Sequence, residues 1–303
     1  MKDWKIGIIG LGMVGTPLKR WFEENGHQRG LDLFLYDIDP KKAYFDNINM
    51  AHIIFVSVPT PRNPDGSCDM SAVDDALGTI VDSVSKIVVI KSTVPPGTTE
   101  YYQYKFPQWK ILFNPEFLTE RQAWEDFLKP DRQIVGFTGN SLDAAHIALS
   151  LLPKAPFMSP WGLGTYKQIR ITATEAEIIK YGGNIYFVRK VNFANMVRDI
   201  CATLGVDYEN VRKAMGADFR IGDSHLDVNH GGYRGWGGYC FPKDLDAFIA
   251  VLINCYNKKG ALLLEADKDF NTALLSSQGL TVEDVSKHGR DIEKIINEKK
   301  NKS

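Results

Sequence analysis

The chain has 303 residues, of which 44% are hydrophobic and 24% are charged, and its formal net charge is −1. These values are typical of a folded globular protein with a sizeable core, and they exclude a chain that is disordered throughout. A charge so close to zero gives no general attraction to nucleic acid or to an anionic membrane, so we predict partners of neither kind.

Signals for targeting, metals and disulfides are missing from the sequence. No apolar run reaches the roughly 18 residues of a membrane span, and "MKDWKIGIIG" has no secretory pattern, so we predict a cytoplasmic protein. Cys68, Cys201, Cys240 and Cys255 show neither a CxxC pair nor the Cys/His spacing of a zinc site. We therefore predict no metal site and no disulfide framework.

The first half of the chain alternates short β-branched runs with helical stretches. In chain order the runs are "KIGIIG", "LFLYD", "HIIFVSV", "KIVVIKST", "KILFNP" and "RQIVGF". This alternation is typical of a parallel sheet wound with helices. It predicts an α/β fold class, with a Rossmann-like doubly wound parallel sheet as an NAD-binding domain over residues 1–171.

A dinucleotide fingerprint begins at the end of the first run. Gly10, Gly12 and Gly15 form a G-x-G-x-x-G, and Asp37 ends the second run 22 residues later. In this motif the glycines allow a tight turn, close approach of a pyrophosphate and packing of the helix on the strand. The carboxylate would accept the ribose hydroxyls and disfavour a 2′-phosphate, which predicts NAD rather than NADP.

From about Thr172 to Leu204 the sequence lacks proline and carries apolar residues at helical spacing. We predict one long helix that opens an all-α central domain over residues 172–303 and forms a homodimer seam, although a purely internal core helix would show the same pattern. Further helices are predicted near residues 208–215, 243–256, 262–275 and 282–298.

The octapeptide "GGYCFPKD" places Cys240 just ahead of a predicted helix whose first turn contains Pro242, Lys243 and Asp244. A helix N-terminus or a nearby cation makes a thiol a better nucleophile, although a lone cysteine is more often a small buried hydrophobe. Cys201 and Cys255 lie inside helical patterns and are predicted to be such buried residues.

Other polar groups could serve the same chemistry. Lys180 and Asn184 are four residues apart on the long helix and could meet one ligand oxygen. The strand ends offer further side chains at the sheet edge where cofactors bind. These are Ser92, Thr93, Glu116 and Glu120.

Seven segments then appear in one order: "SVPTP", "KSTVPPGTT", "NPEFLTE", "PDRQIVG", "EIIKYGGN", "RIG" and "GWGGYCFPKD". From about residue 5 to 275 the chain resembles the UDP-glucose/GDP-mannose dehydrogenase family. The resemblance implies oxidation of a nucleotide-sugar alcohol to a carboxylate with two NAD and a covalent step on Cys240. It implies that Lys180 and Asn184 stabilise the developing oxyanion. It also implies that Glu120, Thr93 and Asp244 orient or deprotonate the alcohol and the hydrolytic water.

The fingerprint and the resemblance together predict cofactor contacts at Gly10, Gly12, Val14, Gly15, Asp37, Lys42, Thr60, Thr93, Glu120 and Lys243. The resemblance predicts substrate contacts at Phe117, Lys180, Asn184, Arg220, Gly235, Gly237 and Gly238. Lys243 would face the cofactor or Asp244, and Arg220 would reach the site of a neighbouring subunit.

The sequence also departs from the family pattern. The usual third domain, which closes over the nucleotide of the substrate, is missing from the match, so a separate polypeptide is one candidate source of those contacts. Between Asp37 and "SVPTP" the segment is too short for the usual helix and strand. His225 and His230 lie in a lengthened loop, where we predict solvated side chains rather than metal ligands.

Two other functions stay open at this point. A two-domain β-hydroxyacid dehydrogenase shares the nucleotide domain and a Lys-x-x-x-Asn pair but needs no nucleophilic thiol. A non-catalytic NAD-binding or nucleotide-sugar-binding remnant would also fit the absence of the third domain. A catalytic role of Cys240 would distinguish a nucleotide-sugar dehydrogenase from a β-hydroxyacid dehydrogenase.

Overall fold

The computed structural model describes residues 4–81, 84–160, 169–287 and 289–300. The chain divides into two compact units, one made of Met1–Asn63 with Cys68–Lys180, and the other made of Pro64–Ser67 with Tyr181–Ser303. The division falls inside the long helix α6, Ala173–Leu204. Each unit has hydrophobic clusters of its own.

A six-stranded sheet forms the centre of the first unit, with the strand order β2-β1-β3-β4-β5-β7. Its strands are β1 (Ile6–Ile9), β2 (Leu33–Tyr36), β3 (Ile53–Val56), β4 (Ile87–Ile90), β5 (Lys110–Phe113) and β7 (Gly136–Phe137). The first five strands are all parallel, so their carboxyl ends share one edge. The predicted doubly wound α/β fold followed by a helical region is confirmed.

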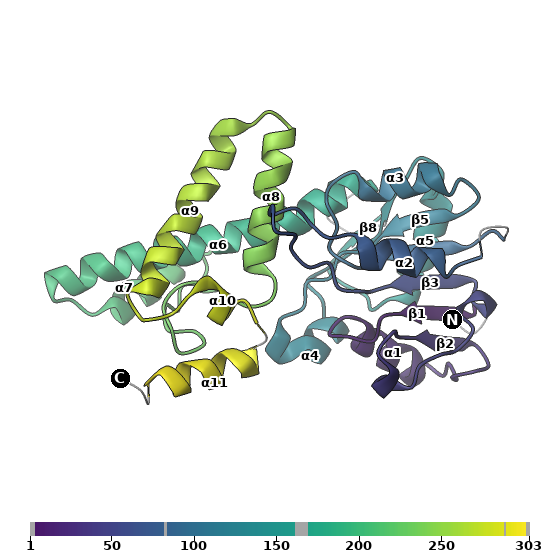
Figure 1. Ribbon diagram of the computed structural model, residues 1–303, viewed down its shortest axis with the longest axis horizontal. Helices are drawn as coiled ribbons and strands as arrows, with labels where there is room; N and C mark the ends of the chain where they lie inside the picture. The colour runs from purple at the N-terminus through teal and green to yellow at the C-terminus, as the bar shows by residue number, and fades with distance from the viewer. Residues whose placement is uncertain (1–3, 82–83, 161–168, 288, 301–303) are drawn as a thin grey trace. The chain divides into compact units, whose positions relative to one another are not determined.

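Helices cover both faces of this sheet (Figure 1). One face packs against α1 (Gly15–Glu24), α4 (Ala123–Leu128) and α5 (Leu142–Leu151). The other face packs against α2 (Ser71–Gly78), α3 (Thr98–Lys105) and the start of α6. Strand residues alternate between the two clusters, and most are fully buried, as expected for strands covered on both faces.

The run "RQIVGF" is not the sixth parallel strand that its composition predicts. Its first residues form β6, Arg132–Ile134, which pairs in parallel with β8, Phe157–Ser159, in a separate two-stranded sheet. Its last residues form β7, which is antiparallel to β5. The composition of a six-residue run does not indicate whether it pairs in parallel or antiparallel. One residue, Val135, separates β6 from β7, and this is enough for the two strands to pair with different neighbours.

The short connection between β2 and β3 contains two 3₁₀ turns, η1 (Pro40–Lys42) and η2 (Ile48–Met50). This agrees with the prediction that the segment is too short for the usual helix and strand. Apolar side chains of the connection still bury themselves against β1, because Ile48 and Ala51 fill the space above Gly7.

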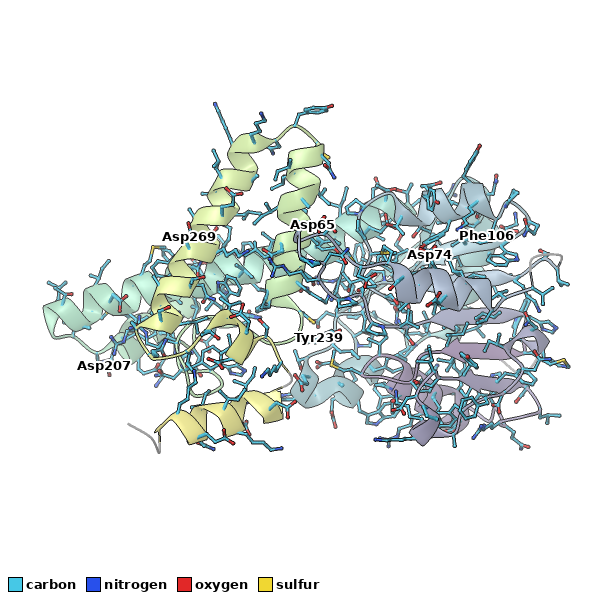
Figure 2. All side chains as sticks on the ribbon, viewed as in Figure 1. Asp65, Asp74, Phe106, Asp207, Tyr239 and Asp269 are labelled. Atoms are coloured by element: carbon cyan, nitrogen blue, oxygen red, sulfur yellow. The ribbon has the colours of Figure 1, made fainter. Side chains whose placement is uncertain are left out.

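The second unit is helical (Figure 1). Besides α6 it contains α7 (Tyr208–Gly216), α8 (Phe241–Asn254), α9 (Lys258–Ser276), α10 (Val282–Val285) and α11 (Gly289–Lys300). Asp207, labelled in Figure 2, is the N-cap of α7. Its carboxylate accepts a hydrogen bond from the backbone N–H of Glu209. Buried residues of α6, α8 and α9 form the main cluster of this unit.

The predicted helix over 282–298 is instead two helices, α10 and α11. Thr281 and Asp284 form a capping box that starts α10, and the helix ends after one turn at Val285. Among the described residues, no helix has the length and apolar character needed to cross a membrane.

Candidate active site

The glycine loop after β1 has the geometry that its spacing predicts. Gly10 has φ +89°, a conformation that favours glycine. A Cβ on Gly15 would lie 1.9 Å from the carbonyl oxygen of Gly10, so only glycine lets α1 pack this closely. A Cβ on Gly12 would meet nothing within 4 Å, which leaves open space beside the backbone at the start of α1. The residues therefore fit a pyrophosphate at this helix N-terminus.

Asp37 connects the end of β2 to that loop. Its Oδ2 accepts hydrogen bonds from the backbone N–H of Leu11 at 2.6 Å and from Lys42 Nζ at 2.8 Å, and its Oδ1 accepts one from the N–H of Asp39. Burial raises the pKa of the Asp37 carboxyl, but these hydrogen bonds outweigh it and leave the pKa below its usual value. Asp37 is therefore ionised at neutral pH and holds Lys42 beside it.

Two predicted hydroxyl residues lie together at the carboxyl edge of the sheet. Thr60, which follows β3, donates its hydroxyl proton to the backbone carbonyl of Thr93 at 2.8 Å. Ser92 donates in the same way to the carbonyl of Val58. The loops after β3 and β4 are thus fastened to each other, with Thr93 only partly buried.

The loop after β5 contains a charged cluster. Lys91, almost fully buried, forms an ion pair with Glu116 at 3.1 Å and donates to Asn114 at 2.6 Å. Lys180 on α6 donates to the backbone carbonyl of Glu116. Its ammonium also lies 5.6 Å from the centre of the Phe117 ring. Lys180, Glu116 and Phe117 are therefore brought together, whereas Glu120 is exposed at the start of η3, Glu120–Gln122.

Glu177 is a buried acidic residue that sequence reasoning missed. It lies on α6 with no solvent exposure, and its carboxylate accepts three hydrogen bonds from Gly97 and Thr99 at the N-terminus of α3, just after the loop that contains Thr93. A glutamate at a helical position next to apolar residues looks like a surface residue. Glu177 is buried because α6 packs over the start of α3, which the local sequence does not indicate.

Burial raises the pKa of Glu177 to about 7, against the lowering effect of its hydrogen bonds. The pKa of Glu177 is thus higher in the folded than in the unfolded chain. The contribution of Glu177 to the free energy of unfolding is therefore complete below about pH 4.5 and is lost as the pH rises through 7. We expect the stability of Glu177→Gln relative to the native chain to increase by up to about 3 kcal/mol between pH 4.5 and 8. Urea unfolding across this range measures it.

A matched control for this pH effect is Glu175→Gln. Glu175 is exposed and accepts hydrogen bonds from Thr172 at the start of the same helix. The backbone hydrogen bond from Thr172 is the largest effect that lowers the pKa of Glu175. Its contribution to the pH dependence of stability therefore has the opposite sign to that of Glu177. A pH dependence of Glu177→Gln equal to that of the native chain would contradict the titration.

Cys240 lies at the N-cap of α8, with Pro242 in the first turn, as the sequence predicts. Its backbone carbonyl accepts the first helical hydrogen bond, from the N–H of Asp244 at 3.0 Å. The side chain is half-buried. A helix N-terminus stabilises a negative charge, so this position suits a cysteine that reacts as a nucleophile.

A buried carboxylate lies one helical turn after Cys240. Asp244 is 1% exposed, and its Oδ2 accepts a hydrogen bond from the Asn184 amide at 2.6 Å. Its Oδ1 forms an ion pair with Lys243. Of the two predicted positions for Lys243, the structure therefore has the one that faces Asp244. Asn184, Lys243 and Asp244 form a connected polar group at the start of α8.

The glycines before Cys240 are held by their own unit. Gly235 has φ +112°, and a Cβ there would lie 2.6 Å from the side-chain oxygen of Asn271. A Cβ on Gly237 would lie 2.6 Å from the carbonyl oxygen of Val285. Gly238 has φ +75°, open space beside its α-carbon and an N–H that donates to Val285 at 2.7 Å. Packing therefore accounts for Gly235 and Gly237, and Gly238 has room for a ligand.

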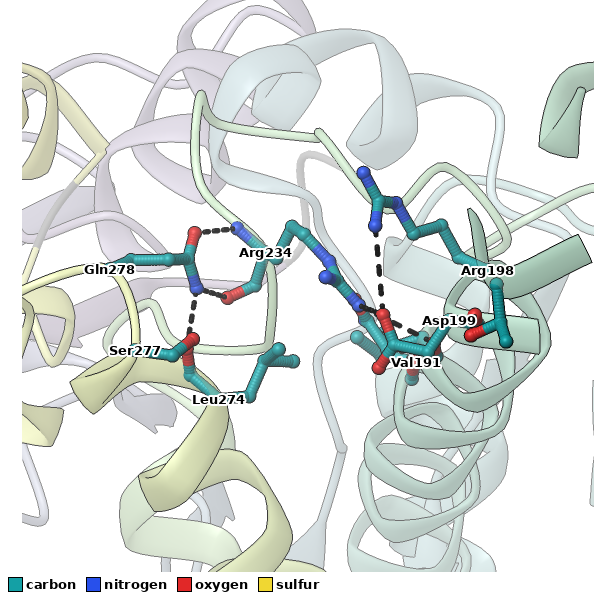
Figure 3. A network of polar contacts seen from close by, with 9 residues as sticks. Val191, Arg198, Asp199, Arg234, Leu274, Ser277 and Gln278 are labelled. Atoms are coloured by element: carbon teal, nitrogen blue, oxygen red, sulfur yellow. Dashed lines mark hydrogen bonds and ion pairs between the residues drawn. The ribbon is translucent and has the colours of Figure 1, made fainter. Parts of the chain in front are cut away.

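Arg234 connects the same loop to α6 and to the segment just beyond α9 (Figure 3). Its guanidinium donates to the Asn195 side chain at 3.0 Å and to Asp199 at 2.7 Å, both on α6. Its backbone N–H and C=O pair with the amide of Gln278, just beyond α9. The hydrogen bonds that Arg234 and Gln278 make could not be predicted from the sequence, because their partners are far away along the chain.

Arg220 follows α7 on the surface of the second unit. Its guanidinium forms a two-point pair with Asp218, with oxygen–nitrogen distances of 2.6 to 3.2 Å, and its side chain is 75% exposed. No contact of Arg220 with the other candidate residues is observed among the described part of this chain. A role across subunits stays a prediction.

The two histidines of the lengthened loop differ. The prediction that His225 is solvated is wrong, because its ring stacks on Phe187 at 4.1 Å and also approaches Phe241. Burial, with the nearby charge of Lys190, lowers its pKa. His230 is exposed. Within the described ranges, histidine, cysteine and carboxylate side chains form no group of three that could hold a metal ion.

The four cysteines, all within the described residues, form no disulfide. Cys201 is buried in α6, as predicted. The prediction that Cys255 is buried is wrong, because the residue ends α8 and is exposed. Helix α8 thus has one thiol at each end.

Comparison with known proteins decides the family. A model of the NAD binding domain of the UDP-glucose/GDP-mannose dehydrogenase family matches residues 41–149, and a model of its central domain matches residues 174–272. This chain belongs to the UDP-glucose/GDP-mannose dehydrogenase family. The two matches together span more than half of the chain, and they confirm the resemblance and the NAD-binding character of the N-terminal region.

Relatives within the family are similar over most of the chain. A UDP-glucose 6-dehydrogenase of Rickettsia bellii is 34% identical over 70% of this chain and 48% of its own length. UDP-glucose 6-dehydrogenase AglM of Haloferax volcanii is 32% identical over 82% of this chain and 65% of its own length. The structure of a UDP-glucose dehydrogenase from Pyrobaculum islandicum superimposes with a TM-score of 0.75, at 28% identity, over 90% of this chain and 69% of that one. The chain thus spans about half to two thirds of these curated relatives.

The position of Asp37 leads to a prediction about cofactor choice. Asp37→Ala should weaken NAD binding and narrow the preference for NAD over NADP by about tenfold, because a charge that repels a 2′-phosphate is removed while Lys42 remains to attract one. Titration with both dinucleotides measures it. Asp39→Asn is the control, since that side chain caps η1 instead. Equal affinity of the native chain for NAD and NADP would refute the role of Asp37.

Proposed function

We propose that this chain is an NAD-dependent nucleotide-sugar dehydrogenase that oxidises a primary alcohol of a UDP-glucose-like substrate to the carboxylate. The observation that carries the proposal is Cys240 at the N-terminus of α8, one turn before the buried Asp244 that Asn184 and Lys243 hold. A β-hydroxyacid dehydrogenase would need no nucleophile at this position.

The chemistry requires two hydride losses and one water. Bound NAD accepts a hydride in each oxidation. In the first, C6 loses a hydride and its hydroxyl loses a proton, which gives an aldehyde. The Cys240 thiolate adds to this aldehyde, and the thiohemiacetal loses a second hydride to become a thioester. Water then displaces the thiolate and releases the acid.

The remaining candidate residues have distinct tasks in this scheme. Lys180 and Asn184 stabilise the oxyanion that forms at C6, because an ammonium and an amide N–H both donate to it. Thr93, Glu120 and Asp244 position the alcohol or the hydrolytic water, or accept a proton from them. Phe117, Arg220 and Gly238 contact the sugar and phosphates, and Gly235 and Gly237 shape the loop that holds Gly238.

The test is a panel of UDP-glucose, GDP-mannose, their N-acetyl analogues and small hydroxyacids, with NADH formation as the readout. Two NADH per acid formed from a nucleotide sugar would support the proposal. Turnover of hydroxyacids alone, with one NADH each, would favour the β-hydroxyacid alternative. No turnover with or without lysate from the source would favour a binding protein. A lower KM and a higher kcat on adding lysate would support a partner polypeptide that contacts the nucleotide.

We also propose that the chain forms a homodimer along α6. Large apolar side chains are exposed along this helix at a spacing that puts them on one side. They are Tyr186, Phe193, Met196, Ile200 and Leu204. Light scattering should give twice the 34.0 kDa of the chain, and Phe193→Glu should give monomers. A native monomer at micromolar concentration would contradict the seam.

A further inference from the structure

Glu177 connects α6 to the loop that follows β4. Its Oε2 accepts a hydrogen bond from the backbone N–H of Gly97 at 2.6 Å, and its Oε1 accepts two from Thr99, from the N–H at 2.9 Å and from the hydroxyl at 2.6 Å. These groups form the N-terminus of α3, where Gly97 has φ +93° and is the N-cap. Burial of a carboxylate is costly, so full use of its acceptors is needed for it to remain there.

A cap for α3 alone does not require this residue. Serine, threonine or aspartate at the N-cap would satisfy the same N–H groups locally and at lower cost. The carboxylate instead comes from a residue about 80 positions away. Its effect is therefore to fix α6 against the loop, in addition to closing the end of α3.

The same turn of α6 holds the neighbouring loop. Lys180, three residues after Glu177, donates to the carbonyl of Glu116, in the loop after β5. Strands β4 and β5 are adjacent and parallel, so the two loops leave the same edge of the sheet. Thr93 lies in the first of these loops, four residues before Gly97, and Pro95 and Pro96 limit the bending of the backbone between them.

We propose that Glu177 is a positioning residue that locks the Thr93 loop to α6, and so fixes the Thr93 hydroxyl relative to the Lys180 ammonium. The proposal rests on the proposed function in one respect, namely that Thr93 and Lys180 serve one substrate. A misplacement of about 1 Å in such a site lowers the rate by about 10²-fold. Loss of the lock should therefore affect kcat more than cofactor binding.

The test compares Glu177→Gln and Thr99→Val with the control Glu175→Gln, at pH 8. Glutamine keeps one acceptor oxygen, and valine removes only the hydroxyl donor of Thr99. We expect kcat with the best nucleotide sugar to fall about 10- to 100-fold in Glu177→Gln, while the dissociation constant for NAD is unchanged. In Glu175→Gln both quantities should equal those of the native chain.

A double-mutant cycle separates positioning from general loss of stability. If Glu177 and Thr99 act through their shared contact, the variant with both Glu177→Gln and Thr99→Val should lose little more kcat than Glu177→Gln alone. An additive loss, or a normal kcat in a folded Glu177→Gln, would overturn the proposal.

Hydrogen exchange tests the lock without any substrate. Amides of residues 97–105 should exchange about tenfold faster in Glu177→Gln than in Glu175→Gln or the native chain. Unchanged exchange would overturn the lock whatever the activity. A native chain that oxidises no nucleotide sugar would instead refute the proposed function, and faster exchange in Glu177→Gln would then still support Glu177 as the lock of this loop.

Discussion

Cys240→Ser is expected to reduce acid formation by about 10³-fold or more, with NAD binding and the fold unchanged. Serine differs by one atom and fits the same N-cap position, where it is a preferred residue. Its hydroxyl is not ionised near neutral pH, however, and cannot form the thioester that the proposed mechanism requires. The measurement is acid formed per NADH, followed over single and multiple turnovers.

The control for the thiol is Cys255→Ser at the other end of α8. Cys255 is exposed, whereas Cys240 is half-buried, so accessibility alone would make Cys255 the more reactive. The positive end of the helix is at Cys240, which favours the thiolate there. We therefore expect iodoacetamide to label Cys240 first and Cys255→Ser to keep native activity. Acid formation at the native rate by Cys240→Ser would remove the residue from the mechanism.

Gly15→Ala is expected to cause the largest loss of stability among the glycine variants, about 3 kcal/mol. The added Cβ would overlap the carbonyl oxygen of Gly10 at 1.9 Å and approach the Ser57 hydroxyl at 2.8 Å. Helix α1 must then move off β1, which also displaces the helix N-terminus that we expect to meet the pyrophosphate. Urea unfolding and NAD titration on the same samples measure both effects.

Gly12→Ala is the matched control for Gly15→Ala, since a Cβ there meets no atom of the protein. Its stability should stay within about 0.5 kcal/mol of the native value. Its affinity for NAD should still fall by about tenfold or more, because the methyl group occupies the space left for the ligand. If Gly12→Ala binds NAD normally, the open space beside Gly12 is not the pyrophosphate site.

The strands and the long helix could be predicted because their signals are local. β-branched runs bounded by turn residues predicted the five parallel strands, and the proline-free segment predicted α6 to within one residue at its start. The glycine spacing predicted the tight turn at Gly10, where φ is +89°, and the close packing at Gly15. In each case the physical requirement lies within a few consecutive residues.

The remaining features depend on partners far away in sequence. Whether β7 runs parallel or antiparallel is decided by its pairing with β5, and the burial of Glu177 by the position of α6 over α3. The stacking of His225 requires Phe187, almost 40 residues earlier. Sequence reasoning named Asn184 and Asp244 separately but could not predict that they would be hydrogen-bonded to each other.

The contacts of Val285 with Gly237 and Gly238 affect where this protein can be truncated or fused to another. The central-domain match ends at residue 272, and a chain shortened there would keep every candidate catalytic side chain. It would nevertheless lose the carbonyl that accepts the Gly238 N–H and the backbone against which Gly237 packs, two and three residues before the proposed nucleophile. It would also uncover Tyr233, which packs against the hydrophobic cluster that contains Leu280 and Ile292. The end of the family-domain match therefore lies within one packed unit, and we expect a fusion or cleavage near residue 285 to disturb the backbone just before Cys240.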